Sequence, residues 1–161
     1  MGISREIRFY LHRELHNFGM ALAHAVKNPA IMSPKGVIIR PSKYSVKGTI
    51  DRLVAFLQQH GATIYARINQ QAELKLVGQE IAPLEFILFG NPKAGGPIMV
   101  ENPLAALDLP LKVIAWEDNQ KKVWLAYNEA TYIAARYSLS HTLINPLNLD
   151  PMITQALETN Q

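Results

Sequence analysis

Two short apolar runs near the end of the chain, separated by two residues, constrain the fold most strongly. The first run is LKVIAWED at residues 111–118, and the second is KKVWLAYN at residues 121–128. Runs rich in Val, Ile and Trp on either side of a short turn predict a β-hairpin, which we place near Asn119. Because a hairpin joins antiparallel strands, the pattern favours an α+β domain with a mainly antiparallel sheet over a doubly wound parallel one.

The chain before and after the hairpin alternates strand and helix signals. The other predicted strands are GVIIRPSKY, ATIYARI and LEFILFG, at residues 36–44, 62–68 and 84–90. A helix capped by Ser45 or Thr49 is predicted to end at Gly61. Further helical segments are predicted at residues 69–79, 101–110, 131–139 and 151–158. Together the segments predict a sheet of about four to five strands with helices packed on it.

The N-terminal residues predict a separate amphipathic helix. Apolar side chains recur at spacings of three and four, which places them on one stripe of a helix: Ile3, Ile7, Leu11, Leu15, Phe18, Leu22 and Val26. Pro29 and Pro34 then end the helix. The predicted organisation is an N-terminal helix at 1–30, an α+β domain at 36–145 and a short C-terminal helix at 146–161.

The composition excludes several kinds of chemistry. The chain has 161 residues, the size of one domain, and no cysteine, which rules out disulfides, thiolate nucleophiles and Cys-ligated metals. No apolar run approaches the roughly 18 residues needed to cross a bilayer, so we expect a cytoplasmic protein without a transmembrane segment. Residues 1–60 carry nine Lys and Arg against three Asp and Glu, whereas residues 61–161 carry seven against ten. The basic first half favours docking on the acidic remainder or on a second subunit over binding nucleic acid or acidic lipid.

The stretch LFGNPKAGGPIMVENP, at residues 88–103, is the strongest candidate for a ligand site. It is not a P-loop, since Lys93 precedes Gly95 and Gly96 and no Ser or Thr follows it. We expect a rigid loop whose glycines allow close backbone approach and whose Lys93 ammonium contacts a small anion. The alternative is a structural corner with Lys93 in solvent.

No other group of residues predicts catalysis, a metal or a cofactor. Glu117 and Asp118 are adjacent on a strand and point to opposite faces, so Asp118 is better placed to hydrogen-bond the hairpin backbone. His12 and His16 share a helix face, but neighbouring arginines repel a cation, which favours a solvated flank over a metal site. The hairpin aromatics do not alternate with Lys or Arg as they do in single-strand nucleic-acid platforms, so no nucleic-acid partner is expected.

The chain resembles a known family in three colinear segments: FGNPKAGGPIM, NPLAALDLPLKVIAWED and KVWLAYN. The family is the domain of unknown function 302 family of bacteria and archaea, and the resemblance covers residues from about 36 to 140. It implies a TATA-binding-protein-like α+β fold, in which a helix lies across a curved antiparallel sheet. The family has no agreed activity, so the resemblance implies a location for a site and not a reaction.

The resemblance also implies that the shared residues form one recurrent surface. With Gly95, they make up the predicted ligand-binding site: Phe89, Gly90, Asn91, Pro92, Lys93, Gly95, Trp116, Glu117, Asp118 and Tyr127. The chain departs from the family where Gly96 replaces a Thr, and where Asn69 and Gln70 replace an acid and an imidazole. The second departure removes the groups that a metal or acid–base role at that position would need.

Three functions remain open at this point. The first is a non-catalytic binding module, a homodimer, in which the loop at 89–97 and the hairpin from Trp116 to Tyr127 form one pocket for a small anionic ligand. The second is an assembly role, in which the basic N-terminal helix docks on a partner. The third is an enzyme that uses Lys93 with Glu101 or Glu117, although Glu101 could equally be a structural partner of the lysine.

Overall fold

The computed structural model of the protein describes residues 33–158. The chain divides into two compact units, Met1–Ser33 and Pro34–Gln161. The predicted N-terminal helix, with His12 and His16, lies outside the described residues.

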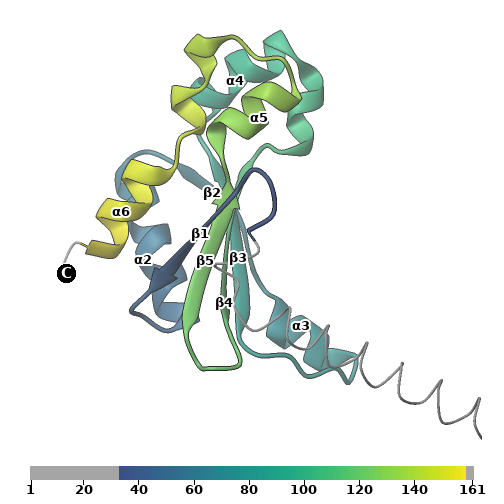
Figure 1. The fold of residues 1–161 in the computed structure, drawn as a ribbon, viewed down its shortest axis with the longest axis vertical. Coiled ribbons are helices and arrows are strands. Elements are labelled where there is room, and N and C mark those ends of the chain that lie inside the picture. The colour runs from purple at the N-terminus through teal and green to yellow at the C-terminus, as the bar shows by residue number, and fades with distance from the viewer. Residues whose placement is uncertain (1–32, 159–161) are drawn as a thin grey trace, which may run out of the picture. The chain divides into compact units, whose positions relative to one another are not determined.

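The second unit contains five strands and five α-helices in a mixed order (Figure 1). The strands are β1 (Val37–Ser42), β2 (Thr63–Asn69), β3 (Leu84–Gly90), β4 (Leu111–Glu117) and β5 (Val123–Asn128). The helices are α2 (Val46–Gln59), α3 (Gln70–Leu76), α4 (Pro92–Glu101), α5 (Ala130–Arg136) and α6 (Asp150–Glu158). Three short 3₁₀ helices are η1 (Pro103–Leu107), η2 (His141–Leu143) and η3 (Asn145–Leu147).

The strands form one antiparallel sheet in the order β1-β5-β4-β3-β2. This confirms the predicted α+β class. The hairpin is also confirmed, with Trp116 of β4 paired with Trp124 of β5. Its connection runs over residues 118–122 and is therefore longer than the two residues that the sequence suggested.

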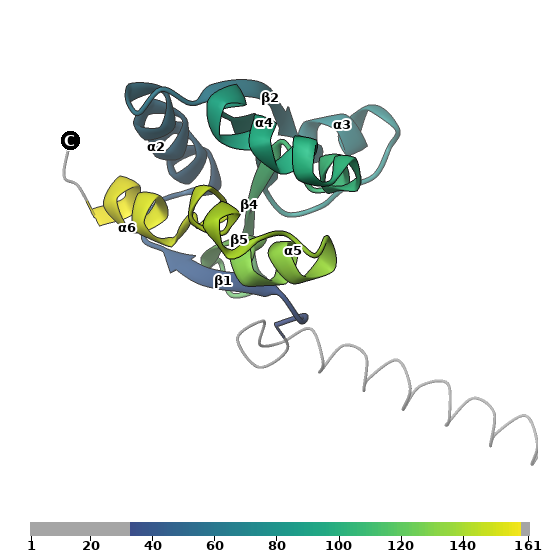
Figure 2. The same ribbon diagram turned by 90° about the horizontal axis from the view of Figure 1, so that it is seen from above.

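Two helices cover one face of the sheet, and the core lies between them and the strands. Figures 1 and 2 show α2 and α6 on the same side, with α4 and α5 beyond one end of the strands. Alternate residues of the strands meet the apolar stripe of α2, as the two periodicities require. The central side chains are almost fully buried: Ile50, Leu53, Leu57, Ile87, Val113 and Leu125.

The ends of α2 and the start of β1 follow from local residue chemistry. Ser45 caps α2 by accepting a hydrogen bond from the amide of Gly48, and Gly61 ends it with a φ of +78°. Gly36, which precedes β1, has a φ of +77° and lies against the ring of Tyr132 in α5. A Cβ atom at Gly36 would lie 2.1 Å from that ring, so only glycine fits there.

The C-terminal helix α6 is part of the same core. It buries Ile153 and Ala156 and packs against α2. Arg40 of β1 connects α6 to the sheet, since the Arg40 guanidinium donates to Asp150 at 2.8 Å and to Thr154 at 2.7 Å. The helix is therefore an integral layer of the fold and not an appendage.

Candidate ligand-binding site

The glycine-rich stretch is the end of a strand followed by a helix, and the prediction of a loop at 89–97 is wrong. β3 ends at Gly90, Asn91 is the N-cap, and Pro92 is the first residue of α4. Asn at the N-cap and Pro in the first turn is a recognised helix start. Gly95 and Gly96 lie within α4, and neither has a positive φ.

The N-terminus of α4 has few amides to offer an anion. The side chain of Asn91 accepts a hydrogen bond from the amide of Lys93 at 2.9 Å. The backbone carbonyl of Asn91 accepts from the amides of Ala94 and Gly95, both at 2.9 Å, and Pro92 has no amide hydrogen. The backbone amides of this turn are therefore hydrogen-bonded within the helix, and the Lys93 ammonium is the group that remains to contact an anion.

A hollow of about 120 Å³ lies beside this turn. Four residues of the predicted site line it: Gly90, Asn91, Pro92 and Gly95. The other walls are largely apolar and include Tyr65, Met99, Leu109 and Leu147. The volume is close to the ~150 Å³ of an apolar cavity that holds one benzene molecule.

The wall opposite α4 comes from the segment that follows η1. Asp108 holds this segment in place, because its carboxylate accepts hydrogen bonds from the hydroxyl of Tyr137 at 2.6 Å and from the guanidinium of Arg136 at 3.1 Å. Leu109 and Pro110, joined by a cis peptide bond, then line the hollow. The sequence contained a signal for this wall, since both residues belong to the DLPLK segment that supported the family resemblance, but their role was not recognised.

The hairpin residues of the predicted site do not join this hollow. In the register of β3 and β4, Phe89 pairs with Leu111, whereas Trp116 pairs with Leu84 at the far end. Five residues of strand separate the two ends, about 17 Å. Glu117 instead lines a second, polar hollow of about 550 Å³, which it shares with Lys43 and Lys122 among others. The single pocket that the sequence suggested is therefore divided between opposite ends of the sheet.

Two other residues of the predicted site face the core. Phe89 is 2% exposed and packs among the apolar side chains under α2. Tyr127 is also buried and donates a hydrogen bond from its hydroxyl to Asp150. Burial, reinforced by that hydrogen bond, raises the pKa of Tyr127 well above its ordinary value. Both side chains thus stabilise the fold and have no access to a ligand at the surface.

Asp118 organises the hairpin, as the sequence predicted. Its Oδ1 atom accepts hydrogen bonds from the amides of Gln120 at 2.8 Å and Lys122 at 2.9 Å. Its Oδ2 atom accepts from the indole nitrogen of Trp124 at 2.8 Å. The bond from Trp124, aided by those from the two amides, lowers the pKa of Asp118.

The acids considered as partners of Lys93 bind elsewhere. Glu101 accepts hydrogen bonds from the amide and hydroxyl of Ser140, at 2.5 and 2.9 Å. Glu117 forms an ion pair with Lys121 at 2.9 Å. The alternative in which Glu101 pairs with Lys93 is therefore not found among the described residues, where the geometry assembles no acid–base pair around the lysine.

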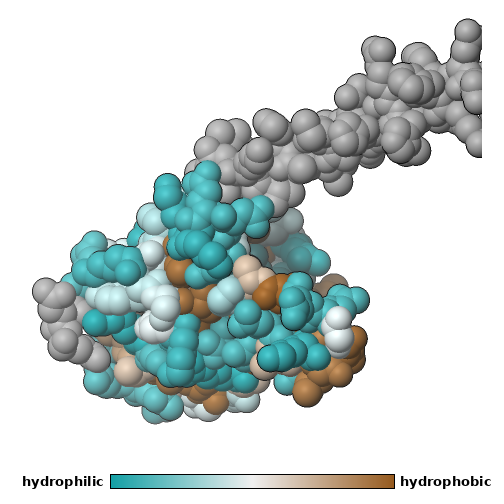
Figure 3. Space-filling model, turned by 90° about the horizontal axis from the view of Figure 1, so that it is seen from below, coloured by the Kyte–Doolittle hydropathy of each residue, from teal (hydrophilic) through white to brown (hydrophobic). Residues whose placement is uncertain are grey.

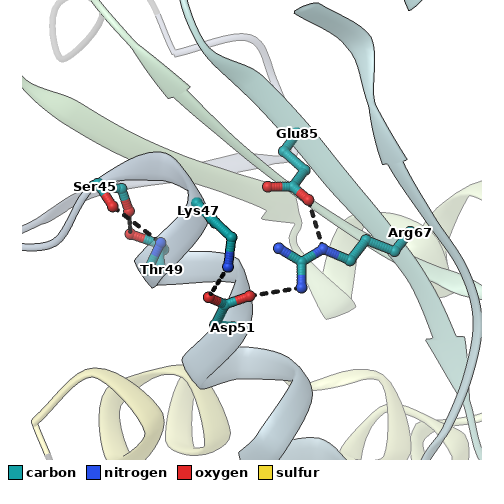
Figure 4. Close-up of polar contacts among 7 residues, drawn as sticks. Ser45, Lys47, Thr49, Asp51, Arg67 and Glu85 are labelled. Atoms are coloured by element: carbon teal, nitrogen blue, oxygen red, sulfur yellow. Dashed lines mark hydrogen bonds and ion pairs between the residues drawn. The ribbon is translucent and has the colours of Figure 1, made fainter. Parts of the chain in front are cut away.

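A cluster of charged residues connects α2 to the edge of the sheet (Figure 4). Arg67 of β2 donates to Glu85 of β3 at 2.5 Å and to Asp51 of α2 at 2.6 Å. Lys47 also binds Asp51, at 2.7 Å, and this hydrogen bond is the main cause of a lowered pKa at Asp51. Glu85 is 6% exposed, so the cluster satisfies a buried carboxylate. Within residues 33–158, no group of three or more His, Asp or Glu side chains is arranged to hold a metal ion.

Comparison with known families identifies the domain. Residues 38–159 match the family described as "Domain of unknown function DUF302", and the chain belongs to this family. The match extends beyond the residues from about 36 to 140 that carried the resemblance in sequence, and it includes α6. A solved structure of an uncharacterised conserved DUF302 protein from Bacillus stearothermophilus has the same fold, with a TM-score of 0.65 and 17% identity over 78% of this chain and 98% of that one.

Most of the chain is also similar to part of several curated proteins. The chain is 33% identical over 133 residues to proteins named "Fluoride-specific ion channel FluC 1" in Brucella suis and "Fluoride-specific ion channel FluC 2" in Brucella melitensis. The aligned region is 83% of this chain but 52% and 48% of those proteins, so the chain spans about half the length of the curated relatives it matches. Among the described residues, no helix has the length and apolar character needed to span a bilayer.

Proposed function

We propose that the chain is a small ligand-binding module whose site is the hollow at the start of α4. The supporting observation is that four residues of the predicted stretch line one hollow with apolar walls. Small-molecule sites typically combine such walls with a few polar groups that orient the ligand. The proposed ligand is a small molecule with an apolar body and an anionic end.

The two parts of this ligand have different partners. The apolar body fits between Met99 and Leu109, where it would be removed from water. The anionic end is assigned to Lys93, which is exposed and lies in the sequence between two lining residues, Pro92 and Ala94. Because the amides of this turn bind Asn91, affinity for the anion alone would be weak, and the apolar contact supplies most of the binding.

We assign the module a binding role and no catalytic one, because Glu101 and Glu117 both bind residues other than Lys93. No carboxylate among the described residues is placed to exchange a proton with Lys93, which a lysine base or electrophile would need.

Titration with two matched pairs of probes tests the proposal. Hexanoate and benzoate carry the anionic end, and hexanol and benzyl alcohol lack it. Binding of all four should shift the methyl resonance of Met99, which lines the hollow. Lys93→Ala should lower the affinity for the two carboxylates by about threefold to fivefold, the effect of losing an exposed ion pair. The affinity for the two alcohols should be unchanged.

Two variants complete this test. Gly95→Leu places a side chain where a Cβ atom meets nothing within 4 Å, and it should block all four probes. Lys122→Ala, at the other end of the sheet, is the matched control and should bind as the native chain does. Probes that leave the Met99 resonance unmoved, or that bind Gly95→Leu as well as the native chain, would refute the proposed site.

A second candidate function, an assembly role, is supported by the curated relatives. A region similar to this chain makes up about half of proteins named as fluoride channels. We infer that the module acts beside such a channel, with the basic residues 1–30 as the docking segment. Co-expression with a channel of this kind, followed by affinity capture in detergent, should recover the full chain and lose it when residues 1–30 are deleted. Equal recovery of both forms would exclude the segment as the dock.

A further inference from the structure

The face of the sheet opposite α2 and α6 is apolar in two of its three rows of residues, and we call it the open face. In the register of the five strands, its residues form rows that cross the sheet. The central row contains one apolar residue from each strand: Ile39, Ala126, Ile114, Phe86 and Ile68. The row beside it, nearer the hairpin, is Pro41, Trp124, Trp116 and Leu84.

Such a face requires a cover. An antiparallel sheet with one solvated face normally alternates apolar and polar residues along each strand. Here β3, β4 and β5 carry large apolar residues on both faces, yet the helices that pack on the core face, α2 and α6, lie on the other side (Figures 1 and 2). An uncovered apolar area of several hundred Å² marks an interaction surface in a soluble domain.

Polar groups are confined to one border of the open face. Lys112 and Asn128 lie in the row nearest α4 and α5, and the Lys112 ammonium stands 5.3 Å from the centre of the Phe86 ring. The Lys112 ammonium thus lies over a ring of the central row, and an occupant of that row would move it off Phe86 to the rim, where it contacts water. The other two rows contain no acidic or basic side chain, so they match an apolar partner and offer nothing to a charged one.

Apolar surface also projects from α3, on the same side as the open face. Figures 1 and 2 place α3 on the side of the sheet away from α2 and α6. Leu76 and Val77, at the end of α3, are 81% and 72% exposed. Seen from the hairpin end, brown apolar surface appears beside the hydrophilic hairpin and again at the margin of the molecule (Figure 3).

We propose that the open face binds the open face of a second copy of the chain. Five strands spaced ~4.8 Å apart and about six residues long give a face of roughly 500 Å² when the Lys112 row is included as its rim, so two whole faces bury about 1,000 Å² before α3 is counted. That is the size from which specific interfaces begin. Two apolar faces of identical composition and the same twist can pack about a two-fold axis, as in a β-sandwich with its sheets ~10 Å apart.

Ile114 is the residue that tests this pairing most directly. It lies in the middle of β4, which is the central strand of the sheet, so a two-fold axis through the face brings both copies of Ile114 close together. The inference does not depend on the proposed ligand, because the hollow at α4 lies beyond the end of the open face.

The first experiment is sedimentation equilibrium of the full chain over about a hundredfold range of concentration. The native protein should sediment at twice the 18.0 kDa chain mass. Ile114→Lys should weaken the dimer by more than about 100-fold, because two buried ammonium groups would face each other. The matched control is Val100→Lys on α4, at a position that is 86% exposed and off the face, and it should remain dimeric. A native chain that is monomeric throughout, or an Ile114→Lys protein that stays dimeric, would overturn the proposal.

Cross-linking gives an answer even if the lysine variant fails to fold. The chain has no cysteine, so a single Ile114→Cys substitution carries the only thiol. A bis-maleimide spanning about 10 Å should join two Ile114→Cys chains in high yield, since this is the separation of packed sheets. Val100→Cys, treated in the same way, should stay uncoupled, and equal coupling of the two variants would contradict a face-to-face dimer.

Discussion

Glu85 is a buried carboxylate whose principal partner is Arg67, at 2.5 Å. Arg67→Met keeps most of the side-chain volume but leaves this acid without its charged partner. The expected cost is about 2 kcal/mol in the free energy of unfolding, measured by urea titration with tryptophan fluorescence. Removing the acid as well, in Arg67→Met with Glu85→Met, should recover most of the loss. An Arg67→Met protein as stable as the native chain would show that water already satisfies Glu85.

Asp118 makes the stability of the hairpin depend on pH. Its pKa is lowered in the folded state, chiefly by the hydrogen bond from Trp124, so the ionised carboxylate favours the folded protein above pH ~4, the ordinary value for Asp. This contribution is lost as the pH falls through the folded-state pKa. Melting curves from pH 7 to pH 2.5 should therefore show the native protein melting above Asp118→Asn at neutral pH and the two curves converging in acid. A constant gap between the two proteins would assign the effect of the substitution to something other than the charge.

Single residues were predictable where their partners lie close in the sequence. Asp118 binds residues two, four and six positions away. Ser45 caps α2 by binding the amide of the residue three positions later, so both roles followed from local chemistry. The partner of Glu101 is Ser140, which lies 39 residues further along, and nothing local to Glu101 indicates it. The sequence placed Glu101 beside Lys93 because that was the nearest opposite charge.

Among the secondary-structure elements, α4 shows that glycine and proline, which usually interrupt helices, can also occur inside one. Gly95, Gly96 and Pro97 predicted a loop, although Asn91 and Pro92 before them form a standard helix start. Gly96 explains how Pro97 is accommodated within the helix. A residue before proline is normally kept out of the helical conformation by a clash with its Cβ atom, and glycine has none.

The two glycines of α4 should therefore respond differently to alanine. Gly95→Ala should stabilise the protein by about 0.5–1 kcal/mol, because the residue is helical and a Cβ atom there meets nothing within 4 Å. Gly96→Ala should give no such gain, because its Cβ atom would crowd the ring of Pro97. Chemical denaturation of both variants measures the difference. An equal gain at both positions would mean that the clash with Pro97 is absorbed by a shift of the helix.

The fold of the whole molecule was more predictable than its site. The hairpin and the spacing of the strands and helices were enough to predict an antiparallel α+β domain, and the five-stranded sheet confirms it. The site required the register of β3 against β4, which places Phe89 and Trp116 at opposite ends. Register depends on contacts between distant segments, so the sequence grouped residues that the sheet separates.

If the open faces pair, the stability of the molecule depends on its concentration. Unfolding would then release two chains from one dimer, so a tenfold increase in protein should raise the melting temperature by roughly 2 °C. The Ile114→Lys protein should melt at one temperature regardless of concentration. Differential scanning calorimetry at several concentrations checks both expectations, and a native melting temperature independent of concentration would contradict the dimer.

The two outer strands influence what kind of assembly the sheet can form. β1 contains Pro41, which has no amide hydrogen to offer another strand, and β2 carries an irregularity between Ile64 and Ala66. Both features discourage a further strand from adding to the edge of a sheet. Growth by the edges would be open-ended and lead toward fibres, whereas pairing through a face saturates after one partner. The margins of the sheet thus protect the protein from aggregation while leaving its broad apolar surface free to associate.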